Sequence, residues 1–467
     1  MIKLRQWQAE CIDLALGKYV SGVSHFLALA TPGAGKTIMA AELAKRMLEQ
    51  DLIDIVLCFS PSSIVCTDFS DTLEKVIGDR FDGLLGARGQ SLTYQGMRFL
   101  NDNFWKLFSV YRVFVIFDEI HHCAGSCVEN SNAWGEQIIL NVQNKAKHTL
   151  ALSGTPWRSD TSPIVLSQYC DSSNSIHCDY VYGLAEAIRD NVCRLPRITA
   201  IDNYEISIFD ENEHKFFSSF KDLLTHSSFP YQNVIENESV IRQILEVGNM
   251  QLDSLRKKDP VAGGLVVACS VEHAYQILEI MRRDLNEDAT IVTYMADAPS
   301  KLIYRYRGCS SKWVISIGMI SEGTNIPRLQ ICCHLSNIKT ELHFRQILGR
   351  ILRWTDSANK YGYLYMPAEP KLVEYAHRVA LDIPEESRVV RLETLKSGFS
   401  HDNTSRKNNL SNSMTKSRQL NVGENAFNEG LQPKVEGILE RNALSDSYEK
   451  MMNIFGRFKQ EVIELDY

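Results

Sequence analysis

The sequence predicts an α/β protein in which two lobes, each built on a parallel sheet, follow one another along the chain. Short apolar runs rich in β-forming residues alternate with helical stretches in the first third of the chain. A second alternation of the same kind begins near Gly263. Continuous apolar strands separated by helices are typical of parallel sheets that are covered on both faces.

The first lobe contains apolar runs that each end in a glycine or a polar residue. These runs are 26–31, 55–61, 112–118 and 148–154. Parallel sheets bind ligands at the carboxyl ends of their strands. We therefore expect a functional site where these runs end.

The second lobe and the remaining segments follow from the same alternation and from composition. Its predicted strands are 264–270, 289–295, 313–318, 329–336 and 361–367. Residues 387–421 carry seven Lys or Arg against two Asp or Glu, so we expect a solvated polar linker, and a segment that binds phosphate is the alternative. The domain boundaries that we expect are 1–195 for the first lobe, 196–262 for a helical connector, 263–370 for the second lobe and 371–467 for a polar basic linker followed by C-terminal helices.

Composition limits the class of protein. A chain of 467 residues has room for two or three domains, and its 44% hydrophobic content is ordinary for a globular protein. The formal charge of −7 argues against a protein that coats DNA with a basic surface, so any nucleic-acid track must be local. We expect a cytoplasmic protein with no membrane segment, because no signal-peptide pattern opens the chain and its cysteines are scattered.

The sequence ATPGAGKT (30–37) follows an apolar run and opens a helical stretch, which is the setting of a phosphate-binding loop. Glycines let backbone N–H groups turn toward phosphate, and the lysine would neutralise the β- and γ-phosphates. The strict pattern has glycine where this chain has Ala30, and a glycine turn without a ligand is the alternative. We expect ATP to contact Thr31, Gly33, Ala34, Gly35, Lys36 and Thr37, with Thr37 also a ligand of Mg²⁺.

The sequence DEIHH (118–122) ends the apolar run 112–117. Asp118 at a strand tip can hold Mg²⁺, and Glu119 is suited to orient the attacking water. His121 is open to two interpretations. It either couples ATP to a substrate or joins a zinc cluster with the residues His122, Cys123 and Cys127, whose crowded spacing is a poor match to zinc sites.

Two further motifs complete the candidate site. In LSGTPWR (152–158), Ser153 and Thr155 are small hydroxyl residues that can bond to the acidic motif and relay movement. In QILGRILR (346–353), the spacing predicts a helix that presents Gln346, Arg350 and Arg353 on one face. Arginine suits the stabilisation of charge in a phosphoryl-transfer transition state, and a solvated basic helix face is the alternative.

These motifs together resemble superfamily 2 helicases, specifically the DExH-box group with type III restriction-like motor subunits and related repair translocases. The resemblance runs from about residue 4 to about residue 367 and includes LRQWQ (4–8) and SEGTNIP (321–327). It implies two tandem RecA-like parallel-sheet lobes with an ATP cleft between them, plus a small helical C-terminal region.

The resemblance also assigns roles to residues that spacing alone does not. Gln8 and Arg5 are expected to contact the adenine, Gly323 to approach the nucleotide, and Gln346 to contact the γ-phosphate or His121. Asn325 stands where many relatives have aspartate, which puts its coupling role in question. A weak match to a nucleic-acid-contacting element covers Thr93, Tyr94 and Gln95.

The function that the resemblance implies is ATP-dependent movement on, or unwinding of, a nucleic acid in repair, restriction or phage defence. ATP and Mg²⁺ are the expected cofactors, and DNA is favoured over RNA as the partner. Two alternatives stay open: a nucleic-acid-sensing ATPase switch, and a motor subunit that serves a partner nuclease or defence subunit. No nuclease signature is visible in the sequence, so any cutting would come from such a partner.

Overall fold

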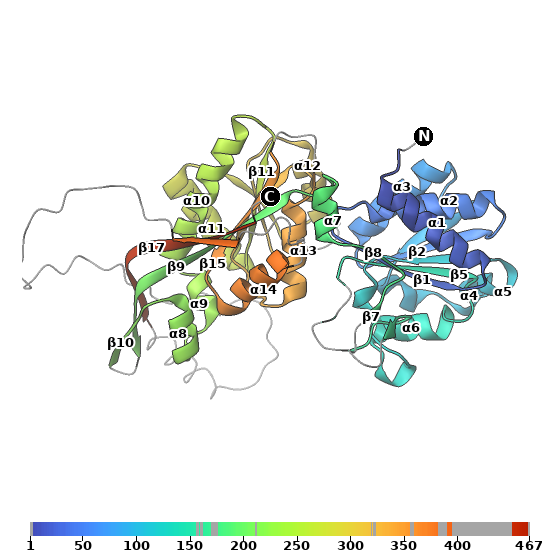
Figure 1. Ribbon diagram of the computed structural model, residues 1–467, viewed down its shortest axis with the longest axis horizontal. Helices are drawn as coiled ribbons and strands as arrows, with labels where there is room; N and C mark the ends of the chain where they lie inside the picture. Colours follow the sequence, from blue (N-terminus) through green and yellow to red (C-terminus); the bar gives the residue numbers. More distant parts are fainter. Residues whose placement is uncertain are drawn as a thin grey trace, which may run out of the picture. The chain divides into compact units, whose positions relative to one another are not determined.

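The structure, a computed structural model, describes residues 3–155, 158, 162–169, 176–210, 213–318, 320, 324–354, 359–381, 390–394 and 451–465. The chain forms two compact units, which are drawn in Figure 1. Unit 1 comprises Met1–Leu195, Ile320–Pro327 and Thr340–Lys360. Unit 2 comprises Pro196–Met319, Arg328–Lys339 and Tyr361–Tyr467.

Unit 1 is built on a six-stranded parallel sheet with the order β3-β2-β4-β5-β1-β8. Its strands are β1 (His25–Ala30), β2 (Ile55–Ser60), β3 (Gly89–Thr93), β4 (Val113–Phe117), β5 (His148–Ser153) and β8 (Tyr180–Tyr182). The central strands are almost wholly buried, which explains their continuous apolar sequences. Because all six run in parallel, the carboxyl ends of β1, β4 and β5 lie along one edge of the sheet.

Helices cover both faces of this sheet. Figure 1 shows α1 (Gln6–Val20), α2 (Lys36–Glu49) and α3 (Ser63–Ile77) on one side and α6 (Ala133–Asn141) on the other. The remaining elements of unit 1 are η1 (Gln95–Phe99), α4 (Asp102–Trp105), α5 (Leu107–Val110), η2 (Ile120–His122), η3 (Val128–Asn130), β6 (Gln168–Tyr169), β7 (Ile176–His177), α7 (Leu184–Arg189) and α13 (Glu341–Ile351).

Unit 2 is built on a second sheet whose first five strands are parallel, in the order β12-β13-β11-β14-β15. These strands are β11 (Gly263–Val267), β12 (Ala289–Val292), β13 (Trp313–Ser316), β14 (Leu329–His334) and β15 (Tyr361–Pro367). The helices are α8 (Phe220–His226), α9 (Tyr231–Ile235), α10 (Glu238–Arg256), α11 (Val271–Leu285), α12 (Pro299–Gly308) and α14 (Pro370–Leu381).

Long antiparallel strands extend the second sheet beyond β15. The order continues through β9 (Leu195–Asp210), β17 (Met451–Leu465) and β16 (Val390–Thr394), and β10 (Glu213–Phe217) pairs with β9. Figure 1 shows β17, near the end of the chain, beside β9. A segment distant in sequence therefore completes this sheet.

The predicted fold class is confirmed: the protein is α/β, with two parallel sheets of the tandem RecA-like kind. Two local predictions were wrong. Residues 451–465 form a strand and not a helix, and the connector expected over 196–262 opens with β9 and β10 before its helices begin. Apolar residues at mixed spacings fit either period, and pairing between the distant strands β9 and β17 decides the outcome.

The other parts of the C-terminal prediction, 382–389, 395–450 and 466–467, lie outside the described residues. The domain boundaries themselves remain a prediction. Within the residues that the structure describes, no helix has both the length and the hydropathy needed to cross a membrane.

Candidate functional site

The loop after β1 has the backbone conformation of an anion-binding turn. Gly33 and Gly35 adopt φ angles of 89° and 95°, in the left-handed region that glycine tolerates best. The N–H of Ala34 donates to the carbonyl of Thr31 at 3.1 Å, which closes the turn. Gly35 is the N-cap of α2 and has no side chain to cap it. The first-turn N–H groups and dipole of α2 are therefore suited to an anion, and Thr37 lies in that turn.

The start of α1 holds this loop from outside. The guanidinium of Arg5 donates to the carbonyl of Ala34 at 2.6 Å, and the side-chain amide of Gln8 donates to the carbonyl of Gly35 at 2.9 Å. The backbone N–H of Arg5 in turn donates to Gln8 Oε1 at 2.8 Å. These contacts fix the loop, and the expected contact of Arg5 and Gln8 with adenine stays a prediction.

The lysine of the loop meets the acidic pair that follows β4. Lys36 Nζ lies 3.2 Å from Glu119 Oε1 and donates to the carbonyl of Ala30 at 3.1 Å. Glu119 adopts a left-handed backbone conformation with φ of 50°. This conformation is energetically unfavourable for a residue other than glycine, and such strained residues cluster at functional sites. Asp118 is 7% exposed and is anchored through its N–H, which donates to the carbonyl of Phe59 at 2.9 Å.

Burial affects the two carboxylates in opposite ways once their neighbours are counted. Burial, reinforced by the negative charge of Glu119, raises the pKa of Asp118. Burial also disfavours the ionised form of Glu119, but the Lys36 ammonium and His121 outweigh it and hold the pKa of Glu119 below its usual range. Of the two carboxylates, Asp118 is therefore the one whose ionised form an added cation would stabilise more.

A hydrogen-bond network joins the end of β5 to the acidic pair. Ser153 Oγ accepts from the N–H of Thr155 at 3.0 Å, donates to the carbonyl of Thr155 at 2.6 Å, and lies 3.0 Å from His121 Nδ1. The N–H of Gly154 donates to Glu119 Oε2 at 3.2 Å. The structure thus brings together Ser153, Thr155, His121 and Glu119, which the sequence places far apart.

Sequence reasoning missed two residues of this network, Gly154 and Arg158. Arg158 donates to the carbonyl of His121. The arginine does belong to LSGTPWR, and its position four residues after the glycine was the only signal that could have found it.

The zinc alternative finds no ligand cluster. The rings of His121 and His122 are tilted by 33° with centroids 4.6 Å apart, and burial raises the pKa of the Cys123 thiol. Cys127 is exposed. Across the described residues, no group of three or more His, Cys, Asp or Glu side chains is arranged to hold a metal ion.

The segment expected to contact nucleic acid is only partly at the surface. Tyr94 is fully buried, donates its hydroxyl to the carbonyl of Asp118 at 2.7 Å and stacks on Trp134. Its side chain supports the acidic motif and has no exposed surface for nucleic acid. Thr93 Oγ1 accepts from the N–H of Gly96 at 3.1 Å, and Gln95 is exposed. The roles of Thr93 and Gln95 remain predictions.

The arginine motif lies on α13 and just beyond it. Gln346 and Arg350 are on the helix and buried, whereas Arg353 follows the end of α13 at Ile351, so the prediction of one helix face for all three was wrong. The helix ends early because the chain at Arg353 forms a β-bridge with Cys193.

Both arginines contact the SEGTNIP segment. Arg350 Nη1 donates to the carbonyl of Thr324 at 2.8 Å, and Arg353 Nη1 donates to Asn325 Oδ1. Asn325 therefore binds an arginine of the motif although it lacks the carboxylate of many relatives. Gly323 lies outside the described residues.

Within unit 1 the arginine motif packs against the glycine loop. A Cβ atom on Gly33 would lie 2.9 Å from Arg353 Cγ, and a Cβ atom on Gly349 would lie 2.6 Å from Pro32 Cβ. Glycine at both positions permits this close approach. The glycine loop and Arg353 are therefore in direct contact.

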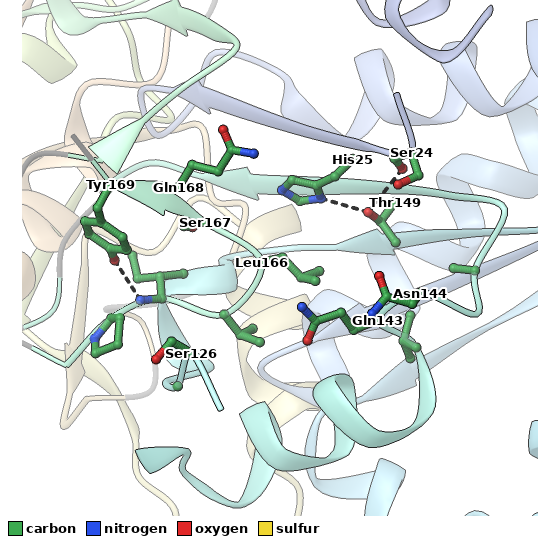
Figure 2. Close-up of a pocket in the computed structure, with 16 residues that line it drawn as sticks. Ser24, His25, Ser126, Gln143, Asn144, Thr149, Leu166, Ser167, Gln168 and Tyr169 are labelled. Carbon is green, nitrogen blue, oxygen red and sulfur yellow. Dashed lines mark hydrogen bonds between the residues drawn. The ribbon is translucent and has the colours of Figure 1, made fainter. Parts of the chain in front are cut away.

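A cavity of unit 1, of about 350 Å³, differs in character from the cluster around Lys36 and Glu119 (Figure 2). Neutral groups line it, among them His25, whose Nδ1 lies 2.7 Å from Thr149 Oγ1, and Tyr169, whose hydroxyl accepts from the N–H of Ile164. Burial lowers the pKa of His25 to about 4, so the imidazole is neutral at pH 7. None of the described residues that line this cavity is charged. The glycine loop with Lys36 is therefore better suited to phosphate than this cavity is.

The N-terminal part of the chain matches a known family. Residues 1–158, which include the glycine loop and the acidic pair, match the family "Type III restriction enzyme, res subunit". Uncharacterised proteins of Mycobacterium tuberculosis and Mycobacterium leprae are each 26% identical over 393 and 388 residues, or 80% of this chain. The chain spans about 62% of the length of the first of these relatives and 63% of the second.

Solved structures share the fold. A fragment assigned as the HsdR subunit of a type I restriction enzyme from Vibrio vulnificus matches with a TM-score of 0.56 and 15% identity, over 80% of this chain and 65% of that one. The Type ISP restriction-modification enzyme LlaBIII bound to DNA matches at 0.51 and 16%, over 82% and 30%. A variant of S. cerevisiae Dbp5 bound to RNA and ADP BeF3 matches at 0.51 and 12%, over 82% and 88%.

Together these matches confirm the resemblance that the motifs predict. Residues 1–158 are similar to the res subunit domain of type III restriction enzymes, and the chain shares the tandem RecA-like fold of these solved structures.

Proposed function

We propose that the protein is a nucleic-acid-dependent ATPase that couples ATP hydrolysis to movement on DNA. The observation that carries this proposal is the contact of Lys36 with Glu119 at the uncapped start of α2. A γ-phosphate bound at this helix start would meet the Lys36 ammonium and the N–H groups of the loop.

In this proposal Glu119 orients the attacking water. The carboxylate stays ionised because Lys36 and His121 lower its pKa, so it can accept a hydrogen bond from water. The N–H of Gly154 fixes its other oxygen. Arg353, which lies against Gly33, would stabilise the charge that develops on the phosphoryl oxygens, and Arg350 and Gln346 would support it.

The residues present also fit Mg²⁺. Hydroxyl and carboxylate oxygens are the ligands that Mg²⁺ prefers, and Thr37 and Asp118 would supply them. The raised pKa of Asp118 fits a group that is ionised more readily beside a cation. When bound, the ion neutralises charge on the phosphates.

The coupling of ATP to nucleic acid rests on the network around Ser153. His121, Ser153 and Thr155 link Glu119 to the chain that follows β5, so a change at the phosphates can reach that segment. The similarity to restriction-enzyme motor proteins supports DNA as the partner. The same similarity supports a motor subunit that serves a partner nuclease as the second candidate function.

The test is ATP turnover by the purified chain with single-stranded DNA, duplex DNA and RNA, each alone. We expect DNA to stimulate turnover more than RNA does. Turnover that no nucleic acid stimulates would contradict the proposal. A strand-displacement assay then separates unwinding from duplex translocation or a switch, and copurification with a neighbouring gene product tests the motor-subunit candidate.

A further inference from the structure

A fully buried arginine lies next to the arginine motif in unit 1. Arg194 is 0% exposed, although arginine is rarely buried unless its guanidinium is well hydrogen-bonded. No motif of the sequence includes it. Such a residue needs a reason for its position.

Arg194 binds the end of α13 through backbone carbonyls. Its Nη1 donates to the carbonyl of Ile351 at 3.3 Å and to the carbonyl of Arg353. Its backbone N–H donates to the carbonyl of Leu352 at 2.7 Å. Carbonyls at the end of a helix have no partner within the helix, and a positive charge there also matches the helix dipole.

The neighbours of Arg194 strengthen this attachment. Cys193 forms a β-bridge with Arg353, and its thiol contacts the carbonyl of Pro32 in the glycine loop at 3.7 Å. On the other side, the N–H of Leu195 donates to the carbonyl of Lys360 at 2.8 Å. Residues 193–195 thus form a strap, which we call the Arg194 strap, across the backbone that carries Arg353.

A buried arginine that binds carbonyls can also be purely structural. Arg328 of unit 2 is 8% exposed and donates to the carbonyls of Tyr306, Val261 and Ser311 at 3.1, 2.9 and 2.8 Å. The difference lies in what is held. Arg194 holds the carbonyl of a residue whose side chain lies against Gly33 and contacts Asn325, whereas none of the three carbonyls that Arg328 holds belongs to a residue proposed for the site.

We propose that Arg194 is a positioning residue that fixes the backbone of Arg353 so that its guanidinium is aimed at the phosphate loop. The proposal rests on the proposed ATPase function. Misplacement of a catalytic group by about 1 Å can lower a rate by about 100-fold while leaving substrate binding intact. Arg194 therefore acts on the rate of hydrolysis through Arg353.

The test is a double-mutant cycle on the full chain with Arg194→Met and Arg353→Ala. We expect Arg194→Met to lower kcat for ATP by about 10- to 100-fold with little change in KM. In the Arg353→Ala background the same substitution should change kcat by less than about threefold, because its effect passes through Arg353. Equal losses of kcat in both backgrounds, or an unchanged kcat, would overturn the proposal.

Two further variants control for folding. Arg194→Lys keeps a cationic donor and should retain more of kcat than Arg194→Met does. Arg328→Met removes a comparable buried arginine from unit 2, and it should lower Tm without the selective loss of kcat. A loss of kcat in Arg328→Met equal to that in Arg194→Met would assign Arg194 a structural role only.

Amide hydrogen exchange separates this proposal from the function on which it rests. In Arg194→Met the amides of residues 351–354 should exchange faster than in the wild type, whether or not ATP is hydrolysed. A wild-type chain without ATPase activity would refute the proposed function and the role of Arg194 in it. An active wild type with unchanged exchange in Arg194→Met would refute the strap alone.

Discussion

The two units each start a helix directly after a buried parallel strand, but the two helix starts differ. In unit 2, α11 follows β11 and is capped by Ser270, whose hydroxyl accepts from the N–H of His273 at 3.1 Å. In unit 1, α2 follows β1 and starts at Gly35, which has no side chain to cap it. A side chain satisfies one helix start, whereas the other keeps its N–H groups for a ligand.

The strand ends differ in the same way. β4 of unit 1 is followed by Asp118 and Glu119, of which Glu119 lies beside Lys36. β14 of unit 2 is followed by Leu335 and Ser336, and the hydroxyl of Ser336 accepts from the N–H of Ile338 at 3.2 Å. The same architecture thus carries the candidate reactive edge in one unit and a scaffold in the other, according to the residues at a few strand ends.

The largest expected effect breaks the reactive edge of unit 1. Lys36→Ala removes the ammonium that lies beside Glu119 and should lower ATP turnover by about 100- to 1,000-fold or more. Lys45→Ala on the same helix is the control, since Lys45 Nζ lies 4.0 Å from Glu49 Oε1, at the opposite end of α2 from the glycine loop. Steady-state ATP hydrolysis measures both. Wild-type turnover in Lys36→Ala would remove this loop from the site.

The second largest expected effect is a fall in the free energy of unfolding at low pH, which His273 of unit 2 causes. Burial lowers the pKa of His273 to about 4, and its Nδ1 accepts from the N–H of Cys269 at 3.2 Å. The pKa of a histidine in the unfolded chain is about 6.5. Between pH 6.5 and pH 4, His273 therefore binds a proton in the unfolded chain but not in the folded one. The free energy of unfolding should therefore fall by up to about 3 kcal/mol as the pH drops from about 6.5 to about 4.

Urea unfolding at a series of pH values measures this dependence, with His273→Gln as the comparison. His25 and His148 of unit 1, whose pKa values burial also lowers to about 4, contribute in the same direction and remain in the variant. The variant should lose part of the pH dependence. An identical dependence in both chains would contradict the assignment to His273.

A smaller effect separates backbone strain from ligand binding in unit 1. Gly35→Ala and Gly78→Ala both place a side chain at a left-handed position, with φ of 95° and 92°, and each should lower the free energy of unfolding by about 1–2 kcal/mol. Only Gly35→Ala should also weaken ATP binding, because its Cβ would lie 2.9 Å from Gln8 Nε2, whereas a Cβ on Gly78 meets no atom within 4 Å. Equal ATP affinities in a titration would contradict this.

The smallest effect tests the scaffold role of the capped helix. Ser270→Ala removes the cap of α11 and should lower the free energy of unfolding by about 1 kcal/mol. ATP turnover should not change, since the cap serves only the fold. Thermal or urea unfolding measures the free energy of unfolding. A clear change in ATP turnover or in the KM for ATP would contradict the scaffold role of this cap.

The parts of the site that could be predicted are those that a short stretch of sequence defines. Gly33, Gly35 and Lys36 sit in one loop between a strand and a helix, and Asp118 and Glu119 end one strand, so local pattern located them. The parallel part of both sheets followed for the same reason, because most of its strands are apolar runs; β3, whose sequence is GQSLT, was not predicted.

What could not be predicted depends on pairing between distant segments. Arg353 leaves α13 because its backbone pairs with Cys193, and Arg194 binds carbonyls that lie far along the chain. Tyr94 matched a nucleic-acid motif yet is buried against the acidic segment. In each case a tertiary contact overrides the local pattern.

The central claim, that unit 1 hydrolyses ATP with Glu119 orienting water, is tested most directly by Glu119→Gln. The variant should lower kcat by about 100- to 10,000-fold. Its affinity for ATP should stay close to that of the wild type, so that unhydrolysed ATP is retained. Glu129→Gln, at an exposed position, should leave both quantities unchanged. Wild-type turnover in Glu119→Gln would contradict the account.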